Sequence, residues 1–233
     1  MRKNHDFRKY YNITEKIGEG KGIIYKAIKK DTNEERAINV INKKIFNLKE
    51  YFKSEINNMI ISEGKNKDNE NTVKFYEYFD TEEEFVLVME LCDENMLNFI
   101  AKRKELKPIE IYDILYQLNN TFKIMYENNI IQRNLILNKI LLKYETNDKT
   151  KYKVKLKLSN GNTLLTQLKK YMSSENFKYS IRFNAPELLN GDTCNAKCDL
   201  WSLGIIIYIL LFKEYPYKGN NEKEILYKIK NDG

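Results

Sequence analysis

The segment Gln132-Arg133-Asn134-Leu135-Ile136-Leu137-Asn138-Lys139 stands between two regular hydrophobic patterns. Its polar positions carry amides and cations, and it contains neither a carboxylate nor a histidine. An amide is not basic near neutral pH, so Asn134 cannot accept a proton as a general base does. The segment therefore lacks a carboxylate or imidazole that could serve as the base at position 134.

The patterns on either side of this segment predict a helical half of the chain. Before it, residues 109–128 carry apolar side chains at three-and-four spacing, which predicts an amphipathic helix. After it, residues 139–144 and 152–158 predict a β-hairpin. Residues 198–212 are apolar on most faces and predict a buried central helix, and residues 221–230 predict a last amphipathic helix.

The first ninety residues have a different pattern. Short β-type runs, separated by turn residues, predict five strands, with one helix between the third and the fourth. The strands are expected at 13–17, 22–28, 36–41, 73–79 and 84–91, and the helix at 45–62. A run of strands followed by a helical half indicates an α+β protein of two lobes.

Composition excludes several classes of protein. The chain has 40 basic and 33 acidic residues, but these charges are interspersed and no nucleic-acid motif accompanies them. The longest apolar run, residues 203–212, is far shorter than the roughly 20 residues that span a bilayer. Cys92, Cys194 and Cys198 form no disulfide or metal pattern. We therefore expect a soluble intracellular protein, in the cytoplasm, that binds neither nucleic acid nor membrane.

A series of motifs, in order from about residue 11 to residue 230, resembles those of the protein kinase family. Residues 18–22 resemble the glycine-rich loop over the phosphates, one residue shorter at its tip. Residues 36–39 resemble the strand whose lysine pairs with the phosphates, and Asn39 takes the place of that lysine. Glu55 fits the helix glutamate that would pair with it.

The resemblance also implies a purine site between the lobes. Residues 88–92 resemble the hinge, with Met89 as the gatekeeper and the backbones of Glu90 and Cys92 at the adenine edge. Apolar side chains on both sides would sandwich the ring. The implied nucleotide-binding residues are Gly18, Gly20, Lys21, Gly22, Ile24, Ala37, Met89, Glu90, Cys92 and Leu141.

The catalytic positions of the family are occupied by other residue types. The segment 132–139 resembles the H-R-D-L-x-x-x-N loop, in which Asn134 replaces the catalytic aspartate and Lys139 the metal-binding asparagine. Ser159 replaces the aspartate of D-F-G. Magnesium prefers carboxylate oxygens, so no metal site is expected. The family's catalytic positions are thus occupied by Asn39, Glu55, Arg133, Asn134, Lys139 and Ser159. These residues do not form an intact catalytic site.

Structural motifs of the family remain in the C-terminal half. Residues 184–187, ending at Glu187, resemble A-P-E, and residues 199–204 resemble D-x-W-S-x-G. Asp199 corresponds to the family's aspartate that binds the backbone of the catalytic loop. Trp201 corresponds to the tryptophan of the same motif. The resemblance implies one protein kinase domain. Residues 1–91 would form an N-lobe with a five-stranded antiparallel sheet and one helix, and residues 92–233 a mainly helical, truncated C-lobe that lacks its last helices.

Three functional hypotheses follow from these substitutions. The first is a pseudokinase that acts as a binding and regulatory module for protein partners, among them an active kinase, with weak and largely metal-independent ATP binding. The second is an active Ser/Thr protein kinase with displaced catalytic groups, in which Lys21 supplies the missing cation. The third is a decayed, truncated kinase without a selected function.

Overall fold

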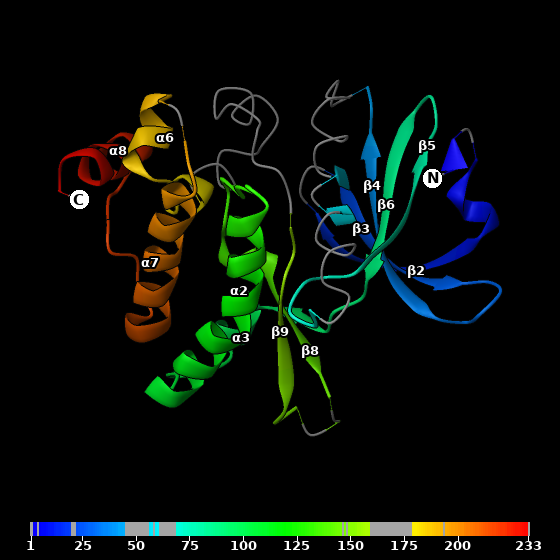
Figure 1. Cartoon of the computed structure of the whole chain (residues 1–233), viewed down its shortest axis with the longest axis horizontal. Helices are drawn as coiled ribbons and strands as arrows, with labels where there is room; N and C mark the ends of the chain where they lie inside the picture. Colours follow the sequence, from blue (N-terminus) through cyan, green and yellow to red (C-terminus); the bar gives the residue numbers. More distant parts are fainter. Residues whose placement is uncertain are drawn as a thin grey trace.

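The computed structural model describes residues 2–3, 5–19, 22–44, 56–57, 59–60, 69–145, 147, 149–158, 179–192 and 194–232. The sheet lies on the right of Figure 1, helices α2, α3 and α7 lie on the left, and the hairpin of β8 and β9 lies between them. This arrangement confirms the expected α+β fold with two lobes.

The N-terminal half is built on one sheet. Its strands are β1 (Arg2–Lys3), β2 (Tyr11–Glu19), β3 (Ile23–Lys29), β4 (Glu35–Asn42), β5 (Phe75–Asp80) and β6 (Glu84–Glu90). They lie in the order β1-β5-β6-β4-β3-β2. All neighbours from β2 to β6 are antiparallel, which confirms the five-stranded sheet, whereas β1 pairs with β5 in parallel. Two residues are too short to show an alternating pattern, so the sequence did not predict β1.

The helix expected at 45–62 lies mostly outside the described residues. Residues 56, 57, 59 and 60 are described, and they are helical. Ile56 and Met59 are buried in an apolar cluster that includes Phe75 and Leu87 of the sheet. This part of the predicted helix therefore packs its apolar side on the sheet, as its spacing indicated.

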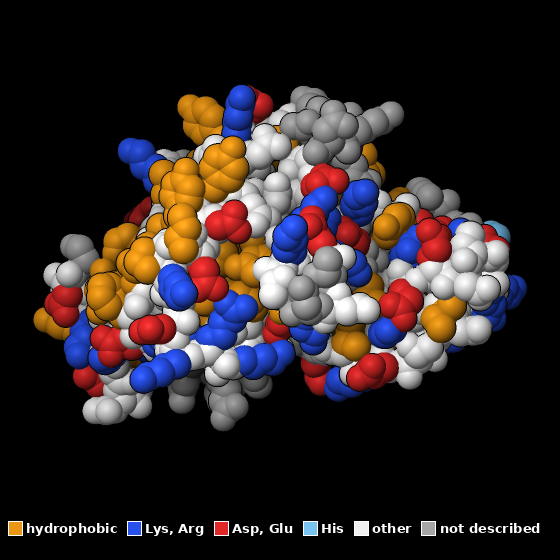
Figure 2. All heavy atoms as spheres, turned by 90° about the horizontal axis from the view of Figure 1, so that it is seen from below, with side chains coloured by type: hydrophobic (Ala, Val, Ile, Leu, Met, Phe, Trp, Pro, Cys, Tyr) orange, Lys and Arg blue, Asp and Glu red, His pale blue; other side chains and the backbone are white. Residues whose placement is uncertain are grey.

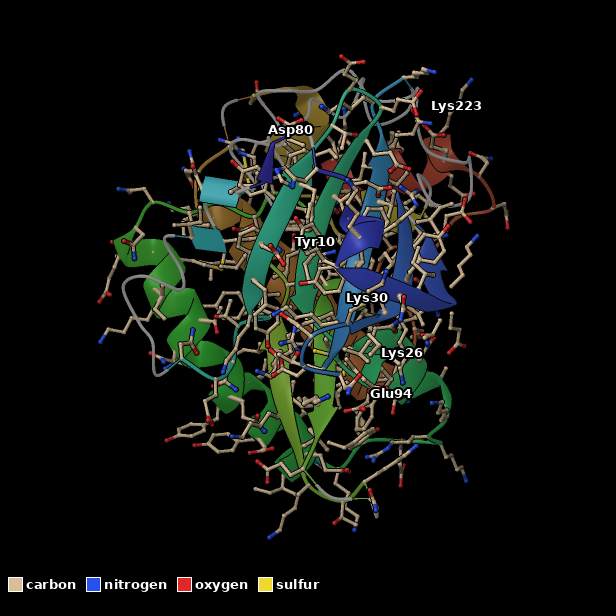
Figure 3. All side chains as sticks on the ribbon, turned by 90° about the vertical axis from the view of Figure 1, so that its right-hand side faces the viewer. Tyr10, Lys26, Lys30, Asp80, Glu94 and Lys223 are labelled. Carbon is tan, nitrogen blue, oxygen red and sulfur yellow. A yellow bond between two sulfur atoms is a disulfide. The ribbon has the colours of Figure 1, made fainter. Side chains whose placement is uncertain are left out.

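The opposite face of the sheet is covered by the N-terminal segment, which includes the 3-10 helix η1 (Phe7–Lys9). Phe7 is buried in a cluster with Phe79 of β5. Arg8 binds both carboxylate oxygens of Glu84 at 2.9 Å. Figure 3 shows this face, where the Lys30 backbone N–H donates to the carbonyl of Tyr10 at 2.9 Å. Residues 5–10 thus form an outer layer on the sheet.

The C-terminal half contains the hairpin and most of the helices. Its elements are β7 (Glu94–Asn95), α2 (Met96–Ala101), α3 (Pro108–Glu127), η2 (Leu137–Lys139), β8 (Ile140–Tyr144), β9 (Tyr152–Leu156), α6 (Pro186–Asn190), α7 (Lys197–Phe212) and α8 (Glu222–Asn231). One core joins α3, the hairpin and α7, and includes Leu118, Leu142 and Ile206. The bounds of α3 and the hairpin match the predicted patterns to within a few residues.

Helix α7 is not fully buried, so that part of the prediction is wrong. Its buried side chains recur at three-and-four spacing and face the core. On its other side Leu200, Leu211 and Phe212 are 63%, 49% and 59% exposed. Hydrophobic side chains gather over the helical half in Figure 2. In the described chain no helix combines the length and hydropathy that crossing a membrane requires.

The cysteines also differ from the prediction. Cys194 and Cys198 form a disulfide with their Cα atoms 6.1 Å apart, whereas Cys92 is free. Cys194 lies just before α7, and Cys198 lies in its first turn. The turn of chain that enters the helix therefore brings the two side chains together. The spacing of the cysteines did not predict this disulfide, because the pairing depends on the local turn of the chain.

Candidate functional site

The catalytic-loop segment is held by the carboxylate of Asp199 at the start of α7. One Asp199 oxygen accepts a hydrogen bond from the backbone N–H of Gln132 at 2.7 Å, and the other accepts from Arg133 at 2.8 Å. Asp199 is buried, and burial raises its pKa against the effect of these two donors. Arg133 has a φ of 53°, a backbone conformation that few non-glycine residues adopt. Asp199 therefore lies where the resemblance places it, and it holds the loop in a defined shape.

The side chains on this loop are amides and cations. Asn134 is half-buried, and its Oδ1 has no hydrogen-bond partner among the described residues. Gln132 is fully buried and donates from Nε2 to the carbonyl of Lys157 at 2.8 Å. Lys139 ends η2, close enough to Asp199 for its charge to favour the ionised carboxylate. Neither Asn134 nor Lys139 offers the carboxylate oxygens that magnesium prefers.

Asn39 lies in the middle of β4, opposite Ile24 on β3 and Leu87 on β6. The residue is only 7% exposed, and its Oδ1 has no hydrogen-bond partner in the described part of the chain. Ala37 comes two residues earlier and is also buried. Because side chains alternate along a strand, Ala37 and Asn39 lie on the same face of β4.

The glycines before β3 differ in their surroundings. A Cβ on Gly22 would lie 2.3 Å from the carbonyl oxygen of Val40 and 2.7 Å from Oδ1 of Asn39. Gly22 is therefore needed for close packing of this chain turn on β4. A Cβ on Gly18 would meet only the side chain of Ile24, at an ordinary 3.6 Å. Gly20 and Lys21 lie outside the described residues.

Apolar residues of the expected purine site come from both lobes. Met89 is buried and pairs in register with Ala37. Cys92 and Leu141 pack on the cluster that contains Met89. Burial raises the pKa of the Cys92 thiol to about 12. The structure thus brings Ala37, Met89, Cys92 and Leu141 together where the sheet meets the hairpin.

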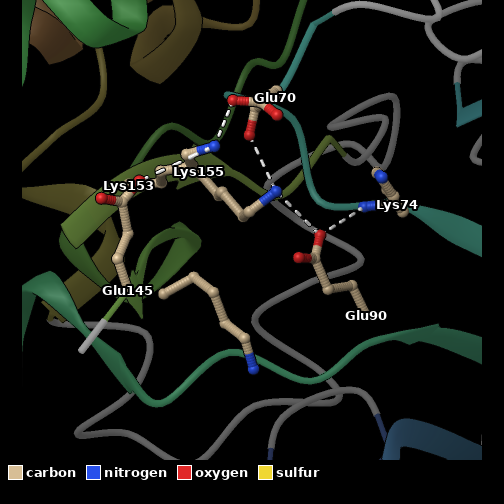
Figure 4. Close-up of a pocket in the computed structure, with 7 residues that line it drawn as sticks. Glu70, Lys74, Glu90, Glu145, Lys153 and Lys155 are labelled. Carbon is tan, nitrogen blue, oxygen red and sulfur yellow. Dashed lines mark hydrogen bonds and ion pairs between the residues drawn. The ribbon is translucent and has the colours of Figure 1, made fainter. Parts of the chain in front are cut away.

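A charged cavity of about 250 Å³ lies beside the hinge strand. It is lined by Glu70, Lys74, Glu90, Lys143, Glu145, Lys153 and Lys155 (Figure 4). The Lys155 ammonium binds the carboxylate of Glu90 at 3.0 Å and the carbonyl of Glu70 at 2.8 Å. The Lys155 side chain is only 4% exposed. This ion pair attaches the hinge to β9, and the sequence analysis missed it because a lysine in an alternating strand suggests a solvated side chain.

The remaining predicted residues divide into two groups. Glu55 and Ser159 lie outside the described residues. Glu187 lies in the first turn of the short helix α6. The Trp201 ring stacks on Tyr217, with centroids 6.0 Å apart and planes within 5°. Trp201 and Tyr217 thus join α7 to the segment that leads to α8.

Comparison with known proteins assigns nearly the whole chain to one protein family. Residues 11–232 match the family described as protein kinase domain. The chain is 34% identical over 233 residues to calcium-dependent protein kinase 5 of Plasmodium berghei, covering 97% of this chain and 39% of that protein. It is 33% identical over 232 residues to the Plasmodium falciparum protein of the same name, covering 97% of this chain and 38% of that protein. Serine/threonine-protein kinase 33 of Mus musculus is 25% identical over 228 residues, covering 95% of this chain and 45% of that protein. The chain thus spans less than half of the length of these relatives.

Proposed function

Because this chain belongs to the protein kinase domain family, we propose that it is a pseudokinase, a kinase-fold domain that works by binding and regulating protein partners. Phosphoryl transfer depends on positioning and electrostatics, with a base for the acceptor hydroxyl, metal ions and a lysine on the phosphates. In this chain the corresponding residues are Asn134, Lys139, Ser159 and Asn39. None of the four can perform the replaced role.

One observation carries the proposal. Asp199 holds the backbone of the catalytic loop with two hydrogen bonds, so the frame around Asn134 is ordered. Under this proposal, activity is lost through the side chains and not through the backbone, because the frame that would place a base is present. Loss of a general base alone costs roughly 10² to 10⁴ in rate. An anchored loop without a base supports a role in binding.

The ligands and location that we propose follow from the same residues. The apolar set from both lobes suits a purine ring, and ATP is expected to bind weakly and without magnesium. The partners are proteins, and an active kinase is the first to test. Interspersed surface charges support a domain that binds neither nucleic acid nor membrane, in the cytoplasm. The division into lobes at residue 91 stays a prediction.

The test measures phosphate transfer and nucleotide binding separately. The purified chain is incubated with labelled ATP and magnesium or manganese, together with a mixture of serine and threonine peptides. The kinase-domain part of the Plasmodium berghei relative serves as the positive control. We expect no transfer above a blank, and a small thermal shift with ATP that EDTA does not remove. Transfer by this chain would contradict the proposal.

The names of the relatives favour a second candidate, an active Ser/Thr protein kinase with displaced catalytic groups. In that case Lys21 would replace the cation missing at Asn39. The variant Lys21→Ala separates the two functions. Transfer that is present in the wild type and lost in Lys21→Ala would establish the second candidate.

A further inference from the structure

The charged cavity beside the hinge has an excess of positive charge. Its lining contains four lysines and three glutamates, which gives a net charge of +1 at neutral pH. All three carboxylates pair with ammonium groups of β9, those of Lys153 and Lys155. Among the described residues no carboxylate pairs with the other two lysines, Lys74 and Lys143. The unbalanced charge therefore lies at these two side chains.

The lysines of the hairpin share one face because side chains alternate along each strand. Lys143 of β8 is opposite Lys153 of β9, and Lys155 follows two residues later on the same strand. Leu142 and Val154 are opposite each other on the other face, where both are buried in the core. Burial of the apolar face thus places all three lysines on the side of the cavity.

Two of these ammonium groups keep hydrogen-bond donors that a ligand can use. An ammonium has three N–H donors. The Lys155 side chain is only 4% exposed and extends between Glu70 and Glu90 in Figure 4. It binds the Glu90 carboxylate and the Glu70 carbonyl, which leaves one donor without an acceptor in the described part of the chain. Lys143 uses one donor, on the carbonyl of Leu91 at 2.9 Å, and keeps two.

The charge of the lining selects among anions. A carboxylate carries one negative charge, which balances the cavity, and its two oxygens accept several hydrogen bonds. A phosphate monoester carries about −1.5 to −2 near neutral pH. It would overcompensate the lining and lie close to three carboxylates, which repel it. An aspartate or glutamate side chain therefore complements this cavity better than a phosphate does.

Resting on the proposed function as a protein-binding module, we propose that this cavity receives an acidic side chain of a protein partner, from a segment rich in glutamate or aspartate. The carboxylate accepts hydrogen bonds from the ammonium groups of Lys74 and Lys143. Lys74 directly precedes β5 of the sheet, and Lys143 lies on β8 of the hairpin. A bound partner thus contacts both lobes beside the hinge.

The test is an NMR titration of the full ¹⁵N-labelled chain at physiological salt with three peptides of six residues: hexaglutamate, hexaglutamine and hexaphosphoserine. We expect hexaglutamate to shift the backbone amide signals of Lys74, Lys143 and Lys155, and to bind at least about tenfold more tightly than hexaglutamine. Hexaphosphoserine, despite its greater charge, should bind no more tightly than hexaglutamate at these signals.

Three outcomes of the titration would overturn this inference. They are tighter binding of hexaphosphoserine, shifts spread over lysines outside the cavity, and absence of hexaglutamate binding. Each of them leaves the pseudokinase proposal standing, because the phosphate-transfer assay tests that proposal separately.

A pair of double variants separates the cavity from the overall charge of the chain. Lys74→Gln with Lys143→Gln removes both unbalanced cations and should weaken hexaglutamate binding at least about tenfold, the value of one charge-assisted hydrogen bond. Lys104→Gln with Lys230→Gln removes the same charge from two exposed lysines that do not line the cavity. This control should weaken binding by less than about twofold, because salt screens distant surface charges.

Thermal unfolding shows whether both double variants are folded. If the cavity variant is unfolded, Lys74→Gln alone replaces it, because the Lys74 side chain is exposed. Equal weakening in the cavity variant and in the control would show that the overall charge attracts the peptide, and would overturn the role of the cavity.

Discussion

At the scale of the residue, Asp199 holds the backbone of the catalytic loop in place, whichever side chains the loop carries. Each carboxylate oxygen accepts one backbone N–H of the loop. In Asp199→Asn one of these oxygens becomes an amide nitrogen, which cannot accept. We expect the free energy of unfolding to fall by about 2–3 kcal/mol, because a buried backbone donor is left unpaired. Urea denaturation measures the change.

The control for this prediction is Asp192→Asn. Asp192 is exposed, and its backbone N–H donates to the carbonyl of Glu187, a bond that the substitution preserves. This variant should change the stability by less than about 0.5 kcal/mol. Equal effects at both positions would contradict the anchoring role of Asp199.

Cys92 gives a prediction for pH dependence. Burial, followed by the charge of Glu90, raises the pKa of the thiol from 9.0 to about 12. Only the thiolate is alkylated, so at pH 8 the folded protein should react with iodoacetamide about 10² to 10³ times more slowly than the protein in urea. The rate should rise with pH until it levels off near 12. Mass spectrometry of the modified peptide measures both rates. Similar rates in the two states would show that the thiol is accessible and ionised normally.

The linked effect on stability has a defined sign. Since the folded pKa of Cys92 lies above the unfolded value, the folded state holds the proton more tightly. The stabilisation is fully present below pH 9.0 and declines as the pH rises toward 12. Cys92→Ala should therefore weaken the loss of stability between these pH values.

At this scale the sequence predicted which residue types occupy the motif positions better than it predicted their burial and contacts. The replacements at Asn39, Asn134 and Lys139 were evident from their motifs. The unpartnered oxygen of Asn39 was not, because it depends on how closely Gly22 approaches β4. The burial of Lys155 depends in the same way on contacts between residues distant in the chain, such as that with Glu90.

At the scale of the element, the turn before β3 is packed on β4 through Gly22. A Cβ there would lie 2.3 Å from the carbonyl oxygen of Val40, a backbone atom that cannot move without disturbing the sheet. Gly22→Ala should therefore lower the free energy of unfolding by about 2 kcal/mol or more. Gly18→Ala is the matched control, because its Cβ would make an ordinary contact at 3.6 Å. It should cost less than about 1 kcal/mol, and thermal denaturation of the two variants compares them. Equal costs would show that Gly22 is not closely packed.

The ion pair between the hinge strand and β9 gives a second comparison. Lys155 is 4% exposed and Glu90 is 15% exposed in their side chains. Lys155→Met leaves the Glu90 carboxylate largely buried without its cation, which should cost about 2–4 kcal/mol in urea denaturation. Lys153→Met on the same strand removes a 35% exposed cation and should cost less than about 1 kcal/mol. Adding Glu90→Gln should recover part of the loss at Lys155, but none of the loss at Lys153.

Elements with strong periodicity were predicted well, and those that depend on their neighbours were not. The pattern of residues 109–128 gave α3 almost to the residue. The pattern of residues 198–212 gave the bounds of α7, but not its burial, because an apolar sequence does not state which of its faces a neighbour covers.

At the scale of the whole molecule, the two halves meet through residues 69–73. The backbone N–H of Val73 donates to the carbonyl of Leu156 on β9 at 3.1 Å. Thr121 of α3 donates to the carbonyl of Asn71 at 3.1 Å. The Asn71 amide donates to the carbonyl of Val154 at 2.9 Å. The motifs predicted two lobes, but this joint lies between motifs and carries no periodic pattern, so the sequence did not reveal it.

We expect this joint to make the two halves one cooperative unit, and Asn71→Ala tests this. Trp201 is the only tryptophan, so its fluorescence reports on the helical half, while hydrogen exchange of β6 reports on the sheet. In the wild type both probes should give the same unfolding free energy. In Asn71→Ala the joint loses the hydrogen bond from the side-chain amide to the carbonyl of Val154, so we expect the hydrogen-exchange protection of β6 to fall by about 1–3 kcal/mol before the Trp201 fluorescence changes.

Asn128→Ala is the control, because it removes a comparable hydrogen bond to the carbonyl of Ile124 within α3. Asn128→Ala should lower the unfolding free energies that the two probes report by the same amount, because that bond does not cross between the halves. Separate transitions in Asn128→Ala, or coincident ones in Asn71→Ala, would place the coupling elsewhere in the interface.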